Sequence, residues 1–340
     1  MKIELNMFLK PNESPQKISL IIDMENSILE IHTKDIEKIA GIETVYLQDY
    51  TKLLIKEKEN GGHYRTAEAY ISALNSFNRF VHNQPIPLIN VTPTLMENYE
   101  GYLKKRDICM NTISFYMRIL KAVYKKAVRQ ELIVNKKPFE NVYTGVAKTK
   151  KRALDIESIK KIKYAETLDE MEQMAQKLFL FSFYTRGMSF VDMAYLKKSD
   201  VKNGVLQYKR RKTGQKIIIK WESAMQEIVD SFNSYNDVYL LPIIRNVGRG
   251  ERNQYRYLQY LINKKLADIG KRLQLPCELT MYVSRHSWAT IAKYIDVPLG
   301  VISDAMGHST ENMTRIYLKS FSESKIDEAN LKIINLFDKL

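Results

Sequence analysis

Apolar side chains recur every three or four positions from residue 44 onward, a spacing that puts them on one face of a helix. The pattern predicts four helices in the first half of the chain: from Val45 to a break at Asn60-Gly-Gly, from Thr66 to Val81, from Leu95 to Lys105 and from Asn111 to Gln130. Residues 1–43 are mixed. In them, 18–22 reads as a strand and 26–39 as a helix, without a fold that can be assigned.

A second patterned region follows residues 145–152 (GVAKTKKR), whose small and basic side chains are typical of a linker that crosses a DNA backbone. Beyond it, Asp155 is a candidate helix N-cap. Residues 172–184 and 190–196 are predicted as buried helices, and 205–209 and 216–221 as two strands of a hairpin around 210–214 (RRKTG). The remainder is predicted helical, with an amphipathic tail over 325–340. The sequence therefore predicts a mainly α protein with a small β-sheet.

The charge of the chain points to a polyanionic partner. Fifty-three Lys and Arg against 39 Asp and Glu leave a net charge of +14. The residues predicted to contact DNA lie on the fourth helix and on the linker: Arg118, Lys121, Lys125, Arg129, Lys148, Lys150, Lys151 and Arg152. A solvated helix face is the alternative for the helical ones. We favour phosphate contacts, because a chain of this charge gains affinity by releasing counterions from DNA.

Composition also excludes several classes of protein. Cys109 and Cys277 stand far apart with no metal-ligand spacing, which argues against a zinc site and for a reducing compartment. No apolar run has the length of a membrane span, and the acidic N-terminus is unlike a signal peptide. We expect a cytoplasmic protein.

Two segments near the C-terminus carry the candidate chemistry: 282–290 (YVSRHSWAT) and 307–317 (GHSTENMTRIY). Together they offer a guanidinium, imidazoles and a phenol, the groups needed to break a phosphodiester through a covalent tyrosine. With 187–192 (GMSFVD) and the RRKTG hairpin, they resemble the tyrosine recombinases of the phage integrase family, and within it the integrases of Bacteroides-type mobile elements. The resemblance extends over about residues 44–325.

The resemblance implies a helical core-binding (SAM-like) domain over 44–144, a linker over 145–152 and a mixed α/β catalytic domain over 153–340, with 1–43 as a possible reduced arm-binding region. Members of the family clamp double-stranded DNA and join a tyrosine to the scissile phosphate, which leaves a 3'-phosphotyrosine and a 5'-hydroxyl. The implied partners are DNA recombination sites, three further copies in a synaptic tetramer, and accessory DNA-bending proteins. No metal or other cofactor is implied.

The family motifs assign roles to individual residues. Tyr317, nine residues after His308, matches the nucleophile, and His308 matches a group that bonds the scissile phosphate. A histidine satisfied by the backbone at a helix end is the alternative for His308. Arg285 matches the second family arginine, whose planar fork can hold two phosphate oxygens. Lys212 matches the lysine that protonates the departing 5'-oxygen, although a lysine on a turn can also be an ordinary phosphate contact.

Two positions depart from the family. Ser189 occupies the place of the first arginine, and a serine hydroxyl cannot replace a delocalised cation. We rank Arg186 first and Arg210 second as the guanidinium that compensates. Tyr282 stands where a histidine is usual; it can donate a hydrogen bond to phosphate but cannot exchange protons near neutral pH.

The function expected on this basis is site-specific recombination by the integrase of a mobile element, in the cytoplasm at the nucleoid. A chromosome-dimer resolvase is a second hypothesis. A relative that binds DNA but has lost its chemistry is a third, suggested by Ser189 and Tyr282.

Overall fold

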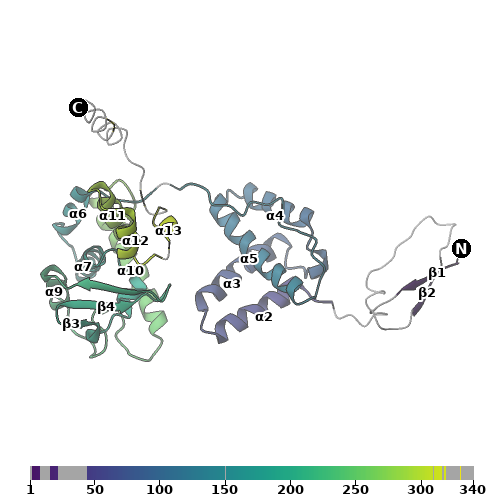
Figure 1. Cartoon of the computed structure of the whole chain (residues 1–340), viewed down its shortest axis with the longest axis horizontal. Helices are drawn as coiled ribbons and strands as arrows, with labels where there is room; N and C mark the ends of the chain where they lie inside the picture. Colours follow the sequence, from purple (N-terminus) through teal and green to yellow (C-terminus); the bar gives the residue numbers. More distant parts are fainter. Residues whose placement is uncertain are drawn as a thin grey trace, which may run out of the picture. The chain divides into compact units, whose positions relative to one another are not determined.

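The computed structural model describes residues 44–149, 151–308 and 310–315, the single residues 318 and 330, and the backbone of two strands. The chain divides into two compact units, Met1–Lys148 and Thr149–Leu340 (Figure 1). The strands β1 (Lys2–Met7) and β2 (Gln16–Ile21) pair antiparallel, with Lys2 opposite Ile21. The strand predicted at 18–22 is confirmed and its partner β1 was not predicted. The helix predicted at 26–39 lies outside the described residues.

Among the described residues of the first unit, four helices form its body, and the sequence predicts all four. They are α2 (Leu47–Asn60), α3 (Tyr64–Phe80), α4 (Pro93–Lys105) and α5 (Met110–Arg129), with a 3₁₀ turn, η1 (Leu88–Asn90), between α3 and α4. Proline fits the first turn of α4 because its missing N–H is not needed there. The hydroxyl of Thr92 accepts from the backbone N–H of Leu95, which caps that helix.

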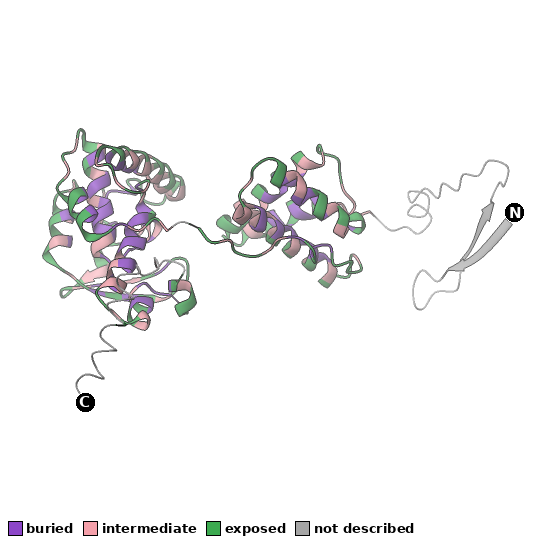
Figure 2. Cartoon of the chain, turned by 90° about the horizontal axis from the view of Figure 1, so that it is seen from above, coloured by how far each residue is buried: buried purple, intermediate pink, exposed green. Residues whose placement is uncertain are grey.

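The apolar stripes of these helices meet in one core. Phe77, Tyr99 and Met117 are fully buried, and buried positions lie along the inner faces of the helices in both units (Figure 2). The ring of Tyr99 lies edge-on to Phe77, with centroids 5.2 Å apart, and its hydroxyl donates to Ser76 Oγ over 2.7 Å. The buried hydroxyl therefore carries no unpaired polar cost.

The start of the segment predicted as a linker is tied to α5. Ser114 Oγ donates to the carbonyl of Gly145 over 2.6 Å, and the Asn111 amide bonds both the N–H and the carbonyl of Ala147. Residues 145–147 thus belong to the first unit.

The second unit surrounds a long buried helix. Its elements are α6 (Ile156–Lys163), α7 (Glu170–Tyr184), α8 (Phe190–Ala194), η2 (Lys198–Asp200), β3 (Val201–Lys202), β4 (Val205–Lys209), β5 (Lys216–Lys220), α9 (Ser223–Asp230), α10 (Glu251–Arg272), α11 (Met281–Tyr294), α12 (Leu299–Ala305) and α13 (Glu311–Arg315). Phe179 and Phe181 of α7 are fully buried, and α7 packs against α9, α10 and α11. The predicted N-cap is confirmed, because Asp155 accepts from the N–H of Ser158 over 2.8 Å.

The strands form an antiparallel sheet in the order β3-β4-β5. The predicted hairpin is β4–β5, with Leu206 opposite Ile219 and Lys209 opposite Lys216. The short strand β3 was not predicted, since two residues are too few for an alternating pattern. The mainly α architecture with a small sheet in the second unit is confirmed. Among the described residues, no helix is long and apolar enough to cross a membrane.

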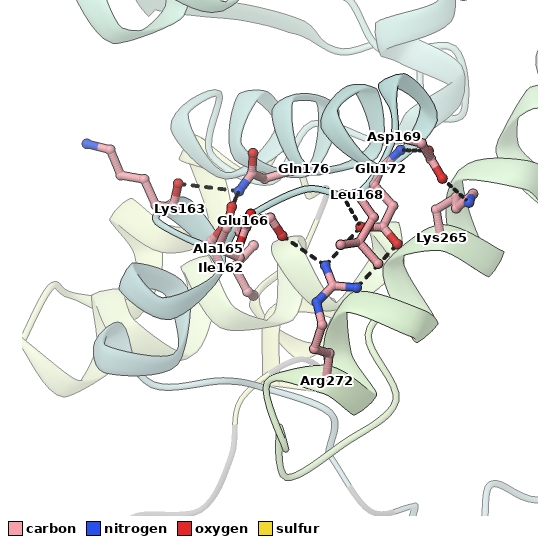
Figure 3. A network of polar contacts seen from close by, with 10 residues as sticks. All are labelled: Ile162, Lys163, Ala165, Glu166, Leu168, Asp169, Glu172, Gln176, Lys265 and Arg272. Atoms are coloured by element: carbon pink, nitrogen blue, oxygen red, sulfur yellow. Dashed lines mark hydrogen bonds and ion pairs between the residues drawn. The ribbon is translucent and has the colours of Figure 1, made fainter.

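A polar network joins α7 to α10 (Figure 3). Glu172, whose side chain is 4% exposed, accepts from Arg272 Nη2 over 2.8 Å and from the N–H of Leu168 over 3.1 Å. Asp169 caps α7 through the N–H of Glu172 and also pairs with Lys265 at 2.5 Å. The bonded guanidinium lowers the pKa of the Glu172 carboxyl. This network fixes the start of α7 against α10.

Candidate active site

Arg285 points from α11 into the interior and is 5% exposed. Its Nη1 donates to the carbonyl of Gly187 over 2.7 Å, and its Nη2 donates to the carbonyl of Met306 over 2.7 Å. The fork of the guanidinium therefore bridges the turn after α7 to the segment after α12. Both of these acceptors are neutral carbonyls.

The turn that receives Arg285 depends on a glycine. Arg186 and Gly187 have positive φ angles of 60° and 73°. A Cβ at Gly187 would lie 2.7 Å from Arg285 Cα, closer than side chains approach a backbone atom. Gly187 thus permits both the reversal of the chain and the close approach of α11.

His308 lies against Arg285 and is 6% exposed. Its Nε2 is 2.9 Å from Arg285 Nη2 and its Nδ1 is 2.8 Å from Thr314 Oγ1 on α13. A guanidinium only donates hydrogen bonds, so Nε2 must be the acceptor and the ring proton lies on Nδ1. Burial and the nearby charges of Arg285, Arg210 and Lys212 lower the pKa of His308 to about 4. The imidazole is neutral at physiological pH.

Arg210 enters the same site from the hairpin, just after β4, and is 6% exposed. Its Nη1 donates to the carbonyl of Met306 over 3.1 Å and to that of Gly307 over 2.5 Å. Gly307 has a φ of 62°, and a Cβ there would lie 2.7 Å from Arg210 Cδ. The arginine therefore fits only because residue 307 has no side chain.

Asp192 supplies the acidic group beside these cations. It is buried on α8, and its Oδ2 accepts from the hydroxyl of Ser189 over 2.7 Å and lies 3.9 Å from Arg210 Nε. Its Oδ1 accepts from the N–H of Arg211 over 2.9 Å. Ser189 also receives the Asp192 N–H as the N-cap of α8. In place of an arginine, this position thus carries a helix cap.

Lys212 lies on the exposed turn of the same hairpin. Its positive charge is among the causes that lower the pKa of His308, after burial, Arg285 and Arg210. The turn is closed by the N–H of Arg210 to Gln215 and of Gly214 to Arg210, both at 2.8 Å.

Arg186, ranked first in the sequence analysis, takes another direction. Its Nη1 donates to the carbonyl of Ile218 on β5 over 3.3 Å, and its side chain lines an apolar groove with Trp288 and Ile291. No contact between Arg186 and the carbonyls that hold Arg285 is found among the described residues. The Arg186 side chain thus contacts β5, whereas Arg210 shares the Met306 carbonyl with Arg285.

Tyr282 lies one helical turn before Arg285, on the outer side of α11. It is 55% exposed, and its ring stands edge-on to the buried ring of His286 at 4.6 Å. Its predicted phosphate contact stays a prediction. Tyr317 lies outside the described residues, as does Lys150.

Two contributors to this site were not found from the sequence. Thr314 Oγ1 bonds the imidazole of His308. The one feature of the sequence that points to Thr314 is its position six residues after His308. Tyr208 on β4 is half-buried. Burial and Asp192 raise the pKa of its phenol, while Arg285, Arg210 and Arg186 oppose that shift.

The site as a whole is an electropositive niche. Arg285 and Arg210 are both buried, and their hydrogen bonds to Met306 and Gly307 do not neutralise them. Asp192 is a buried carboxylate beside Arg210, 3.9 Å from its Nε. Two buried arginines that share one carbonyl acceptor suit the binding of an anion.

The predicted DNA contacts occupy one exposed face of α5. Arg118, Lys125 and Arg129 are exposed and follow one another at helical spacing, with Lys121 partly exposed between them. Of the linker residues, Lys148 and Arg152 are exposed, and Arg152 lies 3.9 Å from Glu278.

The comparisons with known proteins agree with this architecture. Residues 46–145 match the phage integrase SAM-like domain, and residues 153–324, just over half of the chain, match the phage integrase family. The fold and the matches define a tyrosine recombinase architecture. The chain belongs to the phage integrase family.

Solved structures show the same fold. A lambda integrase tetramer bound to a Holliday junction aligns with a TM-score of 0.62 and 17% identity over 89% of each chain. The Tn1549 transposon integrase in complex with transposon right end DNA aligns with a TM-score of 0.62 and 14% identity over 86% of this chain and 99% of that one. XerH site-specific recombinase bound to a palindromic difH substrate aligns with a TM-score of 0.60 and 17% identity over 83% of each chain. No curated protein sequence matches.

Proposed function

We propose that this protein is a site-specific DNA recombinase that cuts and rejoins double-stranded DNA through a 3'-phosphotyrosine on Tyr317. The observation that carries the proposal is the convergence of Arg285 and Arg210 on the Met306 carbonyl, beside His308. Two guanidiniums held side by side suit a phosphate with two non-bridging oxygens.

In the proposed reaction the scissile phosphate replaces the carbonyls of Met306 and Gly307 as the acceptor. The Tyr317 oxygen forms a bond to phosphorus as the bond from phosphorus to the 5'-oxygen breaks. Arg285 and Arg210 stabilise the charge that develops on the non-bridging oxygens. Lys212 donates a proton to the departing 5'-oxygen, and the phenolic proton passes to solvent.

Arg210 takes the role that Ser189 cannot perform. Its support is the acceptor it shares with Arg285, together with Asp192 3.9 Å from its Nε. A role in orienting DNA remains for Arg186, which lies at the edge of the catalytic unit's groove.

The exposed basic face of α5 and the basic residues 148–152 are proposed to contact the DNA backbone. The synaptic complex is proposed to be a tetramer, as the lambda integrase structure on a Holliday junction is for that protein. An apolar groove of about 690 Å³, lined in part by Ile218, Trp288, Ile295 and Val301, is a surface for the amphipathic segment 325–340 of the same or a neighbouring copy.

We infer that the biological role is the integration and excision of a mobile element of the Bacteroides type. This role would involve accessory DNA-bending proteins and would be carried out at the nucleoid. It rests on the departures at Ser189 and Tyr282. Chromosome-dimer resolution is the alternative, distinguished by whether the gene lies between element genes and direct repeats.

Covalent trapping tests the proposal. Incubation with nicked attachment-site DNA should give an SDS-stable adduct with the wild-type protein and none with Tyr317→Phe, which should still bind DNA. Binding without an adduct in the wild type would favour a DNA-binding relative without catalysis. An adduct with Tyr317→Phe would place the nucleophile elsewhere.

A further inference from the structure

Arg211 is held at two points although its side chain is exposed. Its backbone N–H donates to Asp192 Oδ1 over 2.9 Å, and its guanidinium carbon lies 3.7 Å from the centre of the Tyr195 ring. Tyr195 follows directly after α8, which carries Asp192. Asp192 of α8 therefore holds the main chain of Arg211, and Tyr195, directly after α8, holds its side chain.

The ring of Tyr195 is fixed from behind by other aromatic residues. It stands edge-on to Tyr239, with centroids 6.0 Å apart, and close to edge-on to Tyr255 at 5.8 Å. The Tyr239 hydroxyl donates to Glu251 Oε1 over 2.8 Å, at the start of α10. Tyr195 thus presents a rigid face, against which a planar cation stacks favourably.

The position of this anchor matters because Arg211 lies between Arg210 and Lys212. Arg210 points inward to Met306 and Gly307, whereas Lys212 extends from the exposed turn on a flexible four-carbon stem. A proton donor must come within hydrogen-bond distance of the atom it protonates. The Lys212 ammonium can reach that atom reproducibly only if the hairpin turn that carries Lys212 is held still.

We propose that Tyr195 is a positioning residue for Lys212, acting through the guanidinium of Arg211. The inference rests on the proposed function, in which Lys212 protonates the 5'-oxygen as the phosphorus to tyrosine bond forms. Tyr195 touches neither the phosphate nor the leaving group. It restricts the turn at residues 211–214, and thereby the path of the ammonium.

The test compares two nicked DNA substrates that differ in the leaving atom. One has the ordinary 5'-oxygen at the scissile bond and the other has a bridging 5'-sulfur. A thiolate leaves without a proton, so a defect in proton donation slows cleavage of the oxygen substrate and spares the sulfur substrate. A defect in folding, DNA binding or phosphate contact slows both.

We expect Tyr195→Leu to lower the rate of adduct formation on the oxygen substrate about three- to fivefold, the loss that a cation–π contact at an exposed site produces, and to leave the rate on the sulfur substrate unchanged. Tyr195→Phe keeps the ring and should behave as the wild type. Arg211→Leu should share the signature of Tyr195→Leu, and the double variant should be no slower than either single one. Tyr235→Leu is the matched control, because it removes another such pair, with Arg245 4.3 Å from the ring centre. It should change neither rate.

Several outcomes would overturn the inference. Equal slowing of both substrates by Tyr195→Leu would make the residue merely structural, and wild-type rates on both would make the stacking irrelevant. Weaker DNA binding by Arg211→Leu with equal slowing would make Arg211 a phosphate contact. Lys212→Ala distinguishes a failure of the proposed function from a failure of the positioning role. If this variant slows cleavage of both substrates equally, the proposed role of Lys212 as proton donor fails. If it spares the sulfur substrate while Tyr195→Leu does not, only the positioning role fails.

Discussion

Arg285 and Arg210 donate to one oxygen atom, the carbonyl of Met306, at 2.7 and 3.1 Å. They come from α11 and from the β4–β5 hairpin, 75 residues apart in the chain by their numbers, and each is almost fully buried. Like charges are brought together only at a cost, and a carbonyl offsets that cost less well than an anion does. The arrangement therefore suits an anion, which in the proposed function is the scissile phosphate.

Arg210→Ala should abolish most of the cleavage activity while Arg186→Ala does not. Removal of the Arg210 guanidinium, which binds the developing charge, should lower the rate of adduct formation by about 10² to 10³-fold. Arg186→Ala should lower that rate by less than about fivefold, because Arg186 is bonded to the carbonyl of Ile218. Single-turnover trapping on nicked DNA measures both rates, with DNA binding measured in parallel. The opposite order of the two variants would return the role to Arg186.

Gly187→Ala should destabilise the protein and displace Arg285. The added Cβ would lie 2.7 Å from Arg285 Cα at a φ of 73°, so both contact and backbone strain oppose it. Gly204→Ala is the matched control, since its φ is 72° and a Cβ there meets nothing within 4 Å. Strain alone should lower the free energy of unfolding by about 1 kcal/mol in the control, and the clash should add about 1–3 kcal/mol at Gly187. Urea denaturation measures both, and equal losses would refute the contact.

The sequence predicted the helices well because their cores are built from local periodicity. The stripe that begins at Val45 became α2, and the predicted cap Asp155 does cap α6. The hairpin β4–β5 was found from a turn signal between alternating residues. Strand β3 was missed because its two residues acquire strand geometry only by pairing with β4.

The site was less predictable because it is assembled from distant segments. Spacing from Gly187 suggested Arg186 as the compensating guanidinium, whereas the Arg186 side chain donates to the carbonyl of Ile218 on β5. The close fit of Arg210 against Gly307 is a tertiary contact that no local pattern records. Such contacts between residues remote in sequence require the coordinates.

The Glu172–Arg272 pair of Figure 3 should contribute more stability than a surface pair. Arg272→Met leaves the buried Glu172 carboxylate unpaired and should lower the free energy of unfolding by about 3 kcal/mol. The pair Lys160–Glu157, at 2.8 Å but more than half exposed, is the control, and Lys160→Met should cost less than about 0.5 kcal/mol. Equal losses would show that burial adds nothing here. Because Arg272 lowers the pKa of Glu172, its contribution is present at neutral pH and is lost as the pH falls below the ordinary value of 4.5.

His308 should make stability fall at mildly acidic pH, before the carboxylates titrate. Its pKa is lowered from 6.5 to about 4, so between these values the unfolded chain binds a proton that the folded chain does not. The free energy of unfolding therefore decreases as the pH falls through this window, by up to about 3 kcal/mol below pH 4. His308→Gln removes this term. Urea denaturation from pH 7.5 to 4.5 should show the wild type losing stability relative to the variant, and a constant difference would contradict the lowered pKa.

The same histidine should respond to DNA. In the free protein its Nε2 accepts from Arg285 and its Nδ1–H donates to Thr314. A phosphate that takes over Arg285 brings negative charge to the imidazole, which favours the protonated form and raises the pKa. Nitrogen NMR of labelled histidine should therefore show the Nδ1–H tautomer of His308 in the free protein at pH 7. In the complex of the Tyr317→Phe variant with nicked DNA, the pKa of His308 should be higher than in the free variant. An unchanged pKa on DNA binding would mean that the phosphate does not enter the niche between Arg285 and Arg210.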